Sequence, residues 1–428
     1  MVTAMMLSAG ILLQSCGRKQ STITPNLSDY GSQLQGGARF ELEARGNRDR
    51  NPPSGTLMIW TPDYQGMNPL TQKKIDATLT DLIDRFESRY DLVTVIWKKH
   101  SDSIIYKEYS DKIKNGLGPD LILTHNFMIP QLSDKKEISP IPADLSRLHS
   151  IRPKLLRGAR INGELYAVPF ILDVQLLCYD KRKMSTPPAT LQQMVALSKS
   201  GISTAIGGNF LEKMWGLPGF SPSLFGEKKP PAATLKAGLT EWMKTLQAID
   251  SEPNLALFEN SRVMTKYFSE GKISLMNCAS IDLPFLRARV GADNLGISTL
   301  PSINGQPAQP RLTGASFAAN PYMSNKQKDL AFRFTNFAIS TDQQQQIAIN
   351  WNSLLPVNEN SDFNKELLPV LKISEDSFRR SFQLTKDELE ILAINFDSIQ
   401  ELFEDATSGL IDPAKASTEI IDQLEIKQ

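Results

Sequence analysis

Apolar residues in the first part of the globular chain follow two different periods. Residues 57–60 and 92–97 are short runs rich in residues that favour strands. Between these runs, apolar residues recur at every third or fourth position: Ile75, Leu79, Leu82, Ile83 and Phe86. That spacing predicts an amphipathic helix that ends near Tyr90 and is flanked by two buried strands.

The same alternation continues along the chain. A helical pattern over residues 106–114 ends at Gly116, and the turn Gly118-Pro119-Asp120 precedes a strand at 121–124. Strands that alternate with helices in this way pack as a parallel sheet with helices on its faces. The sequence therefore predicts an α/β fold.

Further elements are predicted in the second half of the chain. Strands are expected at 273–277 and 295–300. Helices are expected at 191–199, where Thr190 is the N-cap, and at 210–215, 235–249, 262–268, 326–339, 341–350, 384–407 and 413–426. Mixed strand and helix patterns thus lie on both sides of a central segment, residues 161–179.

This central segment begins as a hairpin and continues as a strand. Asn162-Gly163 favours a two-residue hairpin turn, because both positions of that turn need a positive φ. Residues of strand type follow, but Pro169 has no N–H to donate to a sheet. Pro169 therefore marks a sheet edge, a bulge or a place where the chain changes sheet.

Asp173 is the one charged residue in the run 170–177. A buried carboxylate is costly unless it is paired or hydrogen-bonded, so this position needs an explanation. In one interpretation Asp173 caps a turn at a strand end. In the other it faces a cleft at a crossover between two lobes and contacts the hydroxyls or amines of a ligand.

Composition and charge exclude several partners. The 428 residues contain 47 basic and 47 acidic side chains, a balance that predicts no nucleic-acid partner. The three cysteines form no C-x-x-C motif. Cys178 and Cys278 lie in apolar segments of strand type and are interpreted as small buried residues; whether they pair stays open, because spacing does not show their distance.

Signals for catalysis are absent from the sequence. His100, His125 and His149 lack the spacing of metal ligands. The chain contains neither a G-x-S-x-G elbow nor a phosphate-binding G-x-x-x-x-G-K-[ST] loop, and no carboxylates are spaced as an acid and base pair. The sequence therefore predicts no enzyme, no metal and no cofactor.

The N-terminal residues look like an export signal. The apolar run 5–13 is too short to span a bilayer as a helix and has the length of a signal-peptide core, although no basic residue precedes it. It ends at Leu13-Gln14-Ser15-Cys16, which resembles a bacterial lipoprotein signal with Cys16 as the lipidated residue. Polar residues 17–54 are interpreted as a flexible tether.

An ordered set of short motifs in the central segment carries a resemblance to a known family. The set is Asn162, Gly163, Tyr166, Ala167, Val168, Pro169, Asp173, Tyr179, Asp180 and Lys181. It resembles the extracellular solute-binding proteins of bacterial ABC importers, the maltose-binding-like group. Gly118-Pro119-Asp120, the set Phe268, Gly271, Lys272 and Met276, and Leu355-Pro356-Val357 match other motifs of that group.

The resemblance implies a type II periplasmic-binding-protein fold, in which two α/β lobes are joined by crossover hinge strands. The expected N-lobe is 55–171 with 313–360, and the expected C-lobe is 172–312 with 361–428. A signal peptide at 1–16 and the tether precede them. The implied protein is a monomer in the periplasm or on the outer face of the cell membrane, held there by a lipid anchor, with an ABC permease as its partner.

Candidate ligand-binding residues follow predicted strand or helix ends, where loops converge in open α/β sheets. They are Asp63, Tyr64, Asn126, Phe127, Asp173, Ser280, Asp282, Trp351 and Asn352. Carboxylates and amides bind sugar hydroxyls, and aromatic faces cover sugar C–H surfaces. The alternative is that each Asp or Asn caps its own turn and each aromatic residue packs in the core.

The leading functional hypothesis is a solute-binding component of an ABC importer, specific for a sugar or a related polyol. The Trp that stacks on sugar in the family is missing after Met276, where the chain reads Asn277-Cys278-Ala279-Ser280-Ile281. Two alternatives stay open. One is a periplasmic hydrolase or transferase acting on glycans, with Asp173 as the acid; the other is an interaction lipoprotein without a transport role.

Overall fold

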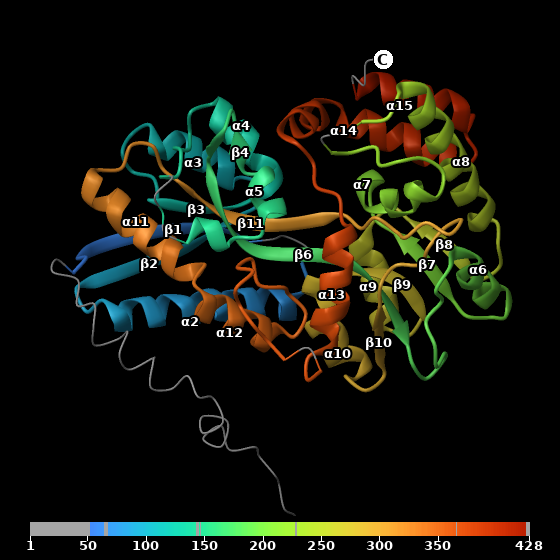
Figure 1. Ribbon diagram of the computed structural model, residues 1–428, viewed down its shortest axis with the longest axis horizontal. Coiled ribbons are helices and arrows are strands. Elements are labelled where there is room, and N and C mark those ends of the chain that lie inside the picture. The colour runs from blue at the N-terminus through green and yellow to red at the C-terminus, as the bar shows by residue number, and fades with distance from the viewer. Residues whose placement is uncertain are drawn as a thin grey trace, which may run out of the picture. The chain divides into compact units, whose positions relative to one another are not determined.

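The longest strand, β6 (Ala167–Asp180), has different partners along its two halves. In the computed structural model its first half, as far as Val174, pairs antiparallel with β11 (Leu312–Ala319). Its second half pairs antiparallel with β9 (Leu275–Ala279) and β10 (Leu295–Ser298). One strand therefore joins two half-sheets in a path of nine strands (Figure 1).

The structure describes residues 52–63, 67–142, 145, 147–226, 229–364 and 366–424. The elements below belong to one unit, Pro53–Gln428. The predicted signal peptide 1–16, and the tether 17–54 up to residue 51, lie outside the described residues. Among the helices that are described, none combines the length and apolar character that a membrane span requires.

The first half-sheet has the order β2-β1-β3-β11-β6. Its parallel strands are β1 (Gly55–Asp63), β2 (Val93–Ser101) and β3 (Leu121–His125). Between β1 and β2 lies α2 (Pro69–Arg89), whose predicted apolar stripe is buried. Helix α2 begins where it does because the Asn68 side chain accepts a hydrogen bond from the Leu70 N–H and proline occupies the first helical position.

The second half-sheet has the order β6-β9-β7-β8, with β10 on β6. Strands β7 (Thr204–Gly207) and β8 (Leu255–Phe258), which the sequence does not predict, are parallel to each other. The helices of this half are α6 (Leu191–Lys199), α7 (Phe210–Lys213), α8 (Ala232–Asp250), α9 (Ser261–Ser269) and α10 (Leu283–Val290). The predicted N-cap is confirmed, since the Thr190 side chain accepts from the Gln193 N–H.

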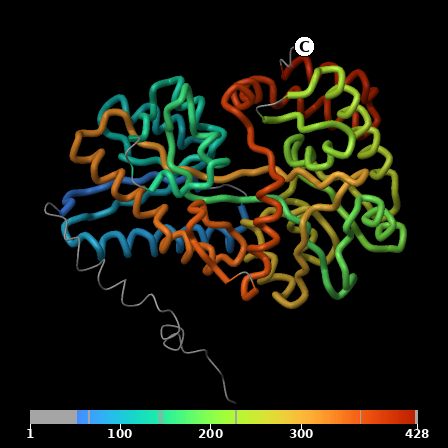
Figure 2. The backbone as a smooth tube through the Cα atoms, viewed as in Figure 1, coloured from blue at the N-terminus to red at the C-terminus, as the bar shows by residue number. Residues whose placement is uncertain are grey.

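The remaining helices complete the layers (Figures 1 and 2). They are α3 (Ile105–Ile113), α4 (Ile129–Asp134), α5 (Pro153–Arg157), α11 (Asn325–Ala338), α12 (Thr341–Trp351), α13 (Pro369–Arg380), α14 (Lys386–Thr407) and α15 (Pro413–Gln423). Short 3₁₀ turns are η2 (Asn126–Met128), η3 (Leu148–Ser150), η4 (Met214–Gly219) and η5 (Ser280–Asp282). The predicted α/β class is confirmed; α13 is an unpredicted helix that contacts β6.

The central segment has the two local features that its sequence predicts. Asn162 and Gly163 have φ values of 51° and 87°, and they connect the hairpin strands β4 (Arg160–Ile161) and β5 (Glu164–Leu165). The pairing of β6 with β11 shifts register beside Pro169: Ser316 pairs with Pro169 and Ala315 with Ile171. Phe170 is the extra residue, so Pro169 sits at a bulge, where its missing N–H is tolerated.

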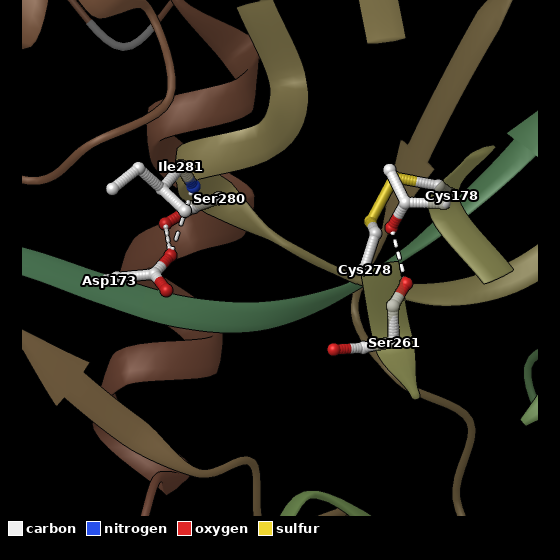
Figure 3. The surroundings of a disulfide bond; sticks show 7 residues. Asp173, Cys178, Ser261, Cys278, Ser280 and Ile281 are labelled. Carbon is white, nitrogen blue, oxygen red and sulfur yellow. Dashed lines mark hydrogen bonds between the residues drawn. A yellow bond between two sulfur atoms is a disulfide. The ribbon is translucent and has the colours of Figure 1, made fainter. Parts of the chain in front are cut away.

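Cys178 and Cys278 form a disulfide between β6 and β9 (Figure 3). The interpretation of both as unpaired buried residues is wrong, because the register of the two strands brings their Cα atoms within 5.9 Å. The bond encloses a loop with a sequence separation of 100 residues. Disulfides persist in oxidising compartments and are rare in the cytosol, so this bond fits a protein that folds outside the cytoplasm.

Reduction of this disulfide should lower the free energy of unfolding by about 2–5 kcal/mol, because the unfolded chain regains the freedom of a long loop. Urea unfolding with and without dithiothreitol measures the change. The matched control is Cys178→Ser with Cys278→Ser, whose unfolding midpoint should not respond to the reductant. Equal midpoints for oxidised and reduced wild type would contradict the expectation.

Candidate functional site

A cavity of about 520 Å³ lies where strand ends from both half-sheets meet. On the side of the first half-sheet it is lined by residues that follow β2 and β3, among them Asp102 and Asn126. On the other side the lining residues include Asn209, after β7, and Ile281, after β9. The cavity therefore lies at the carboxyl ends of parallel strands, the place where open α/β sheets bind ligands.

Asp173 lies at the centre of this arrangement and accepts hydrogen bonds from both half-sheets. Its Oδ1 accepts from Ser280 Oγ at 2.6 Å and from the Ile281 N–H at 3.0 Å, both just beyond β9 (Figure 3). Its Oδ2 accepts from Thr313 Oγ1 on β11 at 3.1 Å. Burial raises the pKa of the Asp173 carboxyl, and these three hydrogen bonds oppose that rise.

Arg311 and Glu212 form a second polar group in the cavity. Arg311 is almost buried, and its Nη1 lies 3.9 Å from Glu212 Oε1. Gln175 on β6 fixes both backbones: its Oε1 accepts from the Arg311 N–H at 2.8 Å, and its Nε2 donates to the Glu212 carbonyl at 2.9 Å. Burial lowers the pKa of Arg311, while the negative charges of Glu212 and Asp173 raise it.

Two further titratable groups have strongly shifted pKa values. Burial, followed by the negative charges of Asp173 and Glu212, raises the pKa of Asp282 to about 7. Burial and the positive charge of Arg311 lower the pKa of His125 to about 4. At neutral pH His125 is therefore uncharged, and it presents ring nitrogens rather than a cation to the cavity.

Apolar and aromatic surfaces make up much of the remaining wall. The Phe127 ring is 49% exposed and stacks on the His125 ring, with 5.1 Å between their centroids. Beside it, Asn126 Oδ1 accepts a hydrogen bond from Ser316 Oγ at 2.6 Å, which orients the amide. The cavity thus combines a partly exposed aromatic ring with fixed polar groups, as small-molecule sites commonly do.

The structure brings together only some of the predicted site residues. Asn126, Phe127 and Asp173 line the cavity. Ser280 is fully buried and donates to Asp173, and Asp282 lies next to the lining residue Ile281. Tyr64 falls outside the described residues.

Three predicted residues lie away from the cavity, each for a local reason. Asp63 is exposed at the end of β1, with Lys99 Nζ 4.0 Å from its Oδ1. Trp351 is 1% exposed and its Nε1 donates to Thr78 Oγ1, so it packs in the core. Asn352 ends α12 with a φ of 49°. That left-handed conformation is one that Asn tolerates, which explains its place in the sequence.

Sequence reasoning missed most of the charged cavity residues, namely Asp102, Glu212, Arg262 and Arg311. Glu212 forms a capping box with Asn209, a local signal for a helix start rather than for a ligand site. Arg311 follows Pro310 in the connection between β10 and β11, and its cavity position depends on residues distant in the chain. Across the described residues, no three His, Cys, Asp or Glu side chains are grouped so that they could hold a metal ion.

A family model described as bacterial extracellular solute-binding protein matches residues 81–367, more than half of the chain. The chain belongs to this family. The match includes both half-sheets except β1, together with most cavity residues. Membership places this solute-binding protein outside the cytoplasm, in agreement with its disulfide.

Solved structures of similar proteins establish the fold. The GacH receptor of Streptomyces glaucescens, solved unliganded and with acarbose, is 18% identical with a TM-score of 0.70 over 88% of this chain and 100% of its own. Maltose-bound MalE3 of T. maritima is 17% identical with a TM-score of 0.70, over 87% and 99% of the two chains. A tagatose-bound solute-binding protein of Thermotoga lettingae is 16% identical with a TM-score of 0.67, over 87% and 100%. The fold is the type II periplasmic-binding fold that the sequence predicts.

The three hydrogen bonds of Asp173 lead to opposite expectations for two substitutions. Asp173→Ala leaves Ser280 and the Ile281 N–H without their acceptor and should lower the free energy of unfolding by about 1–3 kcal/mol. Asp173→Asn should change it by less than about 1 kcal/mol, because the amide oxygen still accepts from these groups, its NH₂ donates to Thr313 and no charge is buried. Thermal and urea unfolding of the unliganded proteins measure both changes.

The exposed Asp63 offers the control for these variants, since Asp63→Ala should leave the unfolding midpoint unchanged. Equal destabilisation by Asp173→Asn and Asp173→Ala would show that the fold needs the negative charge itself.

Proposed function

We propose that this solute-binding protein takes up a sugar or a related polyol in the cavity between its half-sheets and delivers it to an ABC permease. The observation that carries the proposal is the cavity itself, at the carboxyl ends of strands from both half-sheets. A ligand held there touches both halves at once.

The composition of the cavity wall supports a ligand with many hydroxyl groups. Fixed acceptors and donors alternate with apolar surface: Asn126, Asp173 and Arg311 lie near Phe127 and Ile171. Sugars present hydroxyls at their edges and C–H groups on their faces, so they need both kinds of wall. Similar folds bind maltose in T. maritima and tagatose in T. lettingae, which supports the same ligand class.

We propose further that residues 55–171 with 313–360, and 172–312 with 361–428, act as two lobes that close around the solute. Strands β6 and β11, together with the connection between α12 and α13, link them. Closure by hinge motion needs few connections, and residues at element ends absorb the change in backbone angles. The Asp173 carboxylate joins both halves, so a ligand that contacts it is sensed by both.

The export signal and lipid anchor predicted at Cys16 complete the proposal. A solute-binding protein acts beside its permease, and a lipid on Cys16 would hold it at the membrane surface. Nothing in the proposed role needs more than one copy, and we propose a monomer.

A thermal-shift screen of sugars, polyols, amino acids and polyamines tests the ligand class. A sugar or polyol at 100 times its Kd should stabilise the native state by about 2.7 kcal/mol. Asp173→Asn should weaken its binding about ten- to a hundred-fold, since a charged hydrogen-bond partner is lost. Asp63→Asn, the same change on an exposed residue outside the cavity, should bind as wild type does.

Calorimetry gives the affinities, and mass spectrometry checks that the recovered ligand is intact. Release of a cleaved product would favour the glycan-acting enzyme instead. Stabilisation only by amino acids or polyamines would replace the sugar with another solute class.

The lipid anchor has its own test. Cys16→Ser should move the protein from the membrane fraction to the soluble extracytoplasmic fraction, because the thiol that carries the lipid is gone. Fractionation and metabolic labelling with a fatty-acid analogue measure the change. Wild type that is soluble and unlabelled would contradict the anchor and leave the binding role intact.

A further inference from the structure

A second cavity, of about 460 Å³, lies next to the first. The side chains of Gln383 and Leu384, in the connection between α13 and α14, line both cavities. The second cavity also has two sides: α5 and the β4–β5 hairpin form one, and Phe225, Gly226 and residues 381–387 form the other. The two cavities are therefore neighbours along one groove between the half-sheets.

The second cavity is basic along one wall. Lys154, Arg157 and Arg160 line it from α5 and β4. The acidic lining residue is Asp387, which is exposed on the opposite side. Lys386 also lines the cavity, but its Nζ lies 2.6 Å from Glu390 and 3.7 Å from Asp134, so acidic partners offset its charge.

The surroundings of the basic wall show that its positive charge is not offset within the protein. Lys154 Nζ donates to the carbonyls of Phe378, Arg379 and Ser381 at the end of α13, which are neutral acceptors. Burial and the positive charge of Arg157 lower the pKa of Lys154 to about 8. The nearby Glu375 carboxylate already pairs with Arg152 at 3.0 Å.

The first cavity has the opposite balance. Its lining residues include Asp102, Asp173 and Glu212 against Arg262 and Arg311, and its histidine is uncharged at neutral pH. An anion would be repelled from Asp173 and Glu212, but attracted by the basic wall of the neighbouring cavity. The groove therefore discriminates between the two ends of a long ligand by charge.

We propose that the solute is an acidic oligosaccharide, with a sugar unit in the first cavity and a carboxylate or sulfate group against Arg157 and Arg160 in the second. This inference rests on the proposed sugar-binding function and adds the chemical class of the ligand. Guanidinium groups suit this role because they bind carboxylate and sulfate oxygens through two parallel N–H donors. Both arginines are exposed at the cavity wall and accessible to such a group.

The test compares acidic oligosaccharides with their own neutral forms. The probes are trigalacturonate and trimannuronate against their methyl esters, and a chondroitin sulfate tetrasaccharide against its desulfated, esterified form. At least one acidic probe should bind about ten-fold more tightly than its neutral form, and the advantage should shrink as salt is raised. Calorimetry at low and high ionic strength measures both effects.

Two double variants assign the effect to the second cavity. Arg157→Gln with Arg160→Gln should remove the advantage of the acidic probe and leave binding of its neutral form unchanged. Arg85→Gln with Arg89→Gln changes net charge equally on exposed positions of α2, outside both cavities, and should retain the advantage. Melting of each unliganded variant checks that the fold is intact.

Each other outcome has a definite meaning. Equal binding of acidic and neutral forms overturns the inference and leaves the sugar-binding function standing. A monomeric galacturonate that binds as tightly as the trimer, or an advantage that survives in Arg157→Gln with Arg160→Gln, also overturns it. Stabilisation by no carbohydrate in the earlier screen rejects the proposed function itself.

Discussion

Strand β6 pairs with β11 through Val174 and with β9 from Gln175 onward, so the hydrogen bonds of one strand hold both half-sheets. All the neighbouring features follow from this change of partner. Pro169 and the bulge at Phe170 adjust the strand before it, and the disulfide at Cys178 secures the strand after it. The cavity exists because parallel strands on either side end at the same crossing point.

Asp173 shows how a polar side chain is maintained at such a crossing. Burial disfavours its charge, and donors from both half-sheets stabilise it, so its protonation and position are linked to their relative placement. The two interpretations of Asp173 from the sequence are therefore compatible. It satisfies a strand end, and it also faces the cavity.

Local signals in the sequence predicted the elements that depend on local chemistry: the stripe of α2, the turn at Asn162-Gly163 and the Thr190 cap. Strands β7 and β8 span four residues each, too short for a clear period, and two of the four buried residues of α13 are serines. The cavity was predictable only in part. Trp351 and Phe127 both follow regular patterns, yet long-range packing buries one and exposes the other. Arg311 and Glu212 meet because strands far apart in sequence pair, which no local pattern encodes.

The bond between Cys178 and Cys278 also bears on when the molecule reaches its final form. The ribosome makes the second cysteine 100 residues after the first, so most of the second half-sheet must be synthesised before the cross-link can close. Cytosolic thiols are kept reduced, so a chain still inside the cell lacks this covalent tie and unfolds more easily for export. The oxidation state of this single bond therefore reports on which side of the membrane a given molecule has folded.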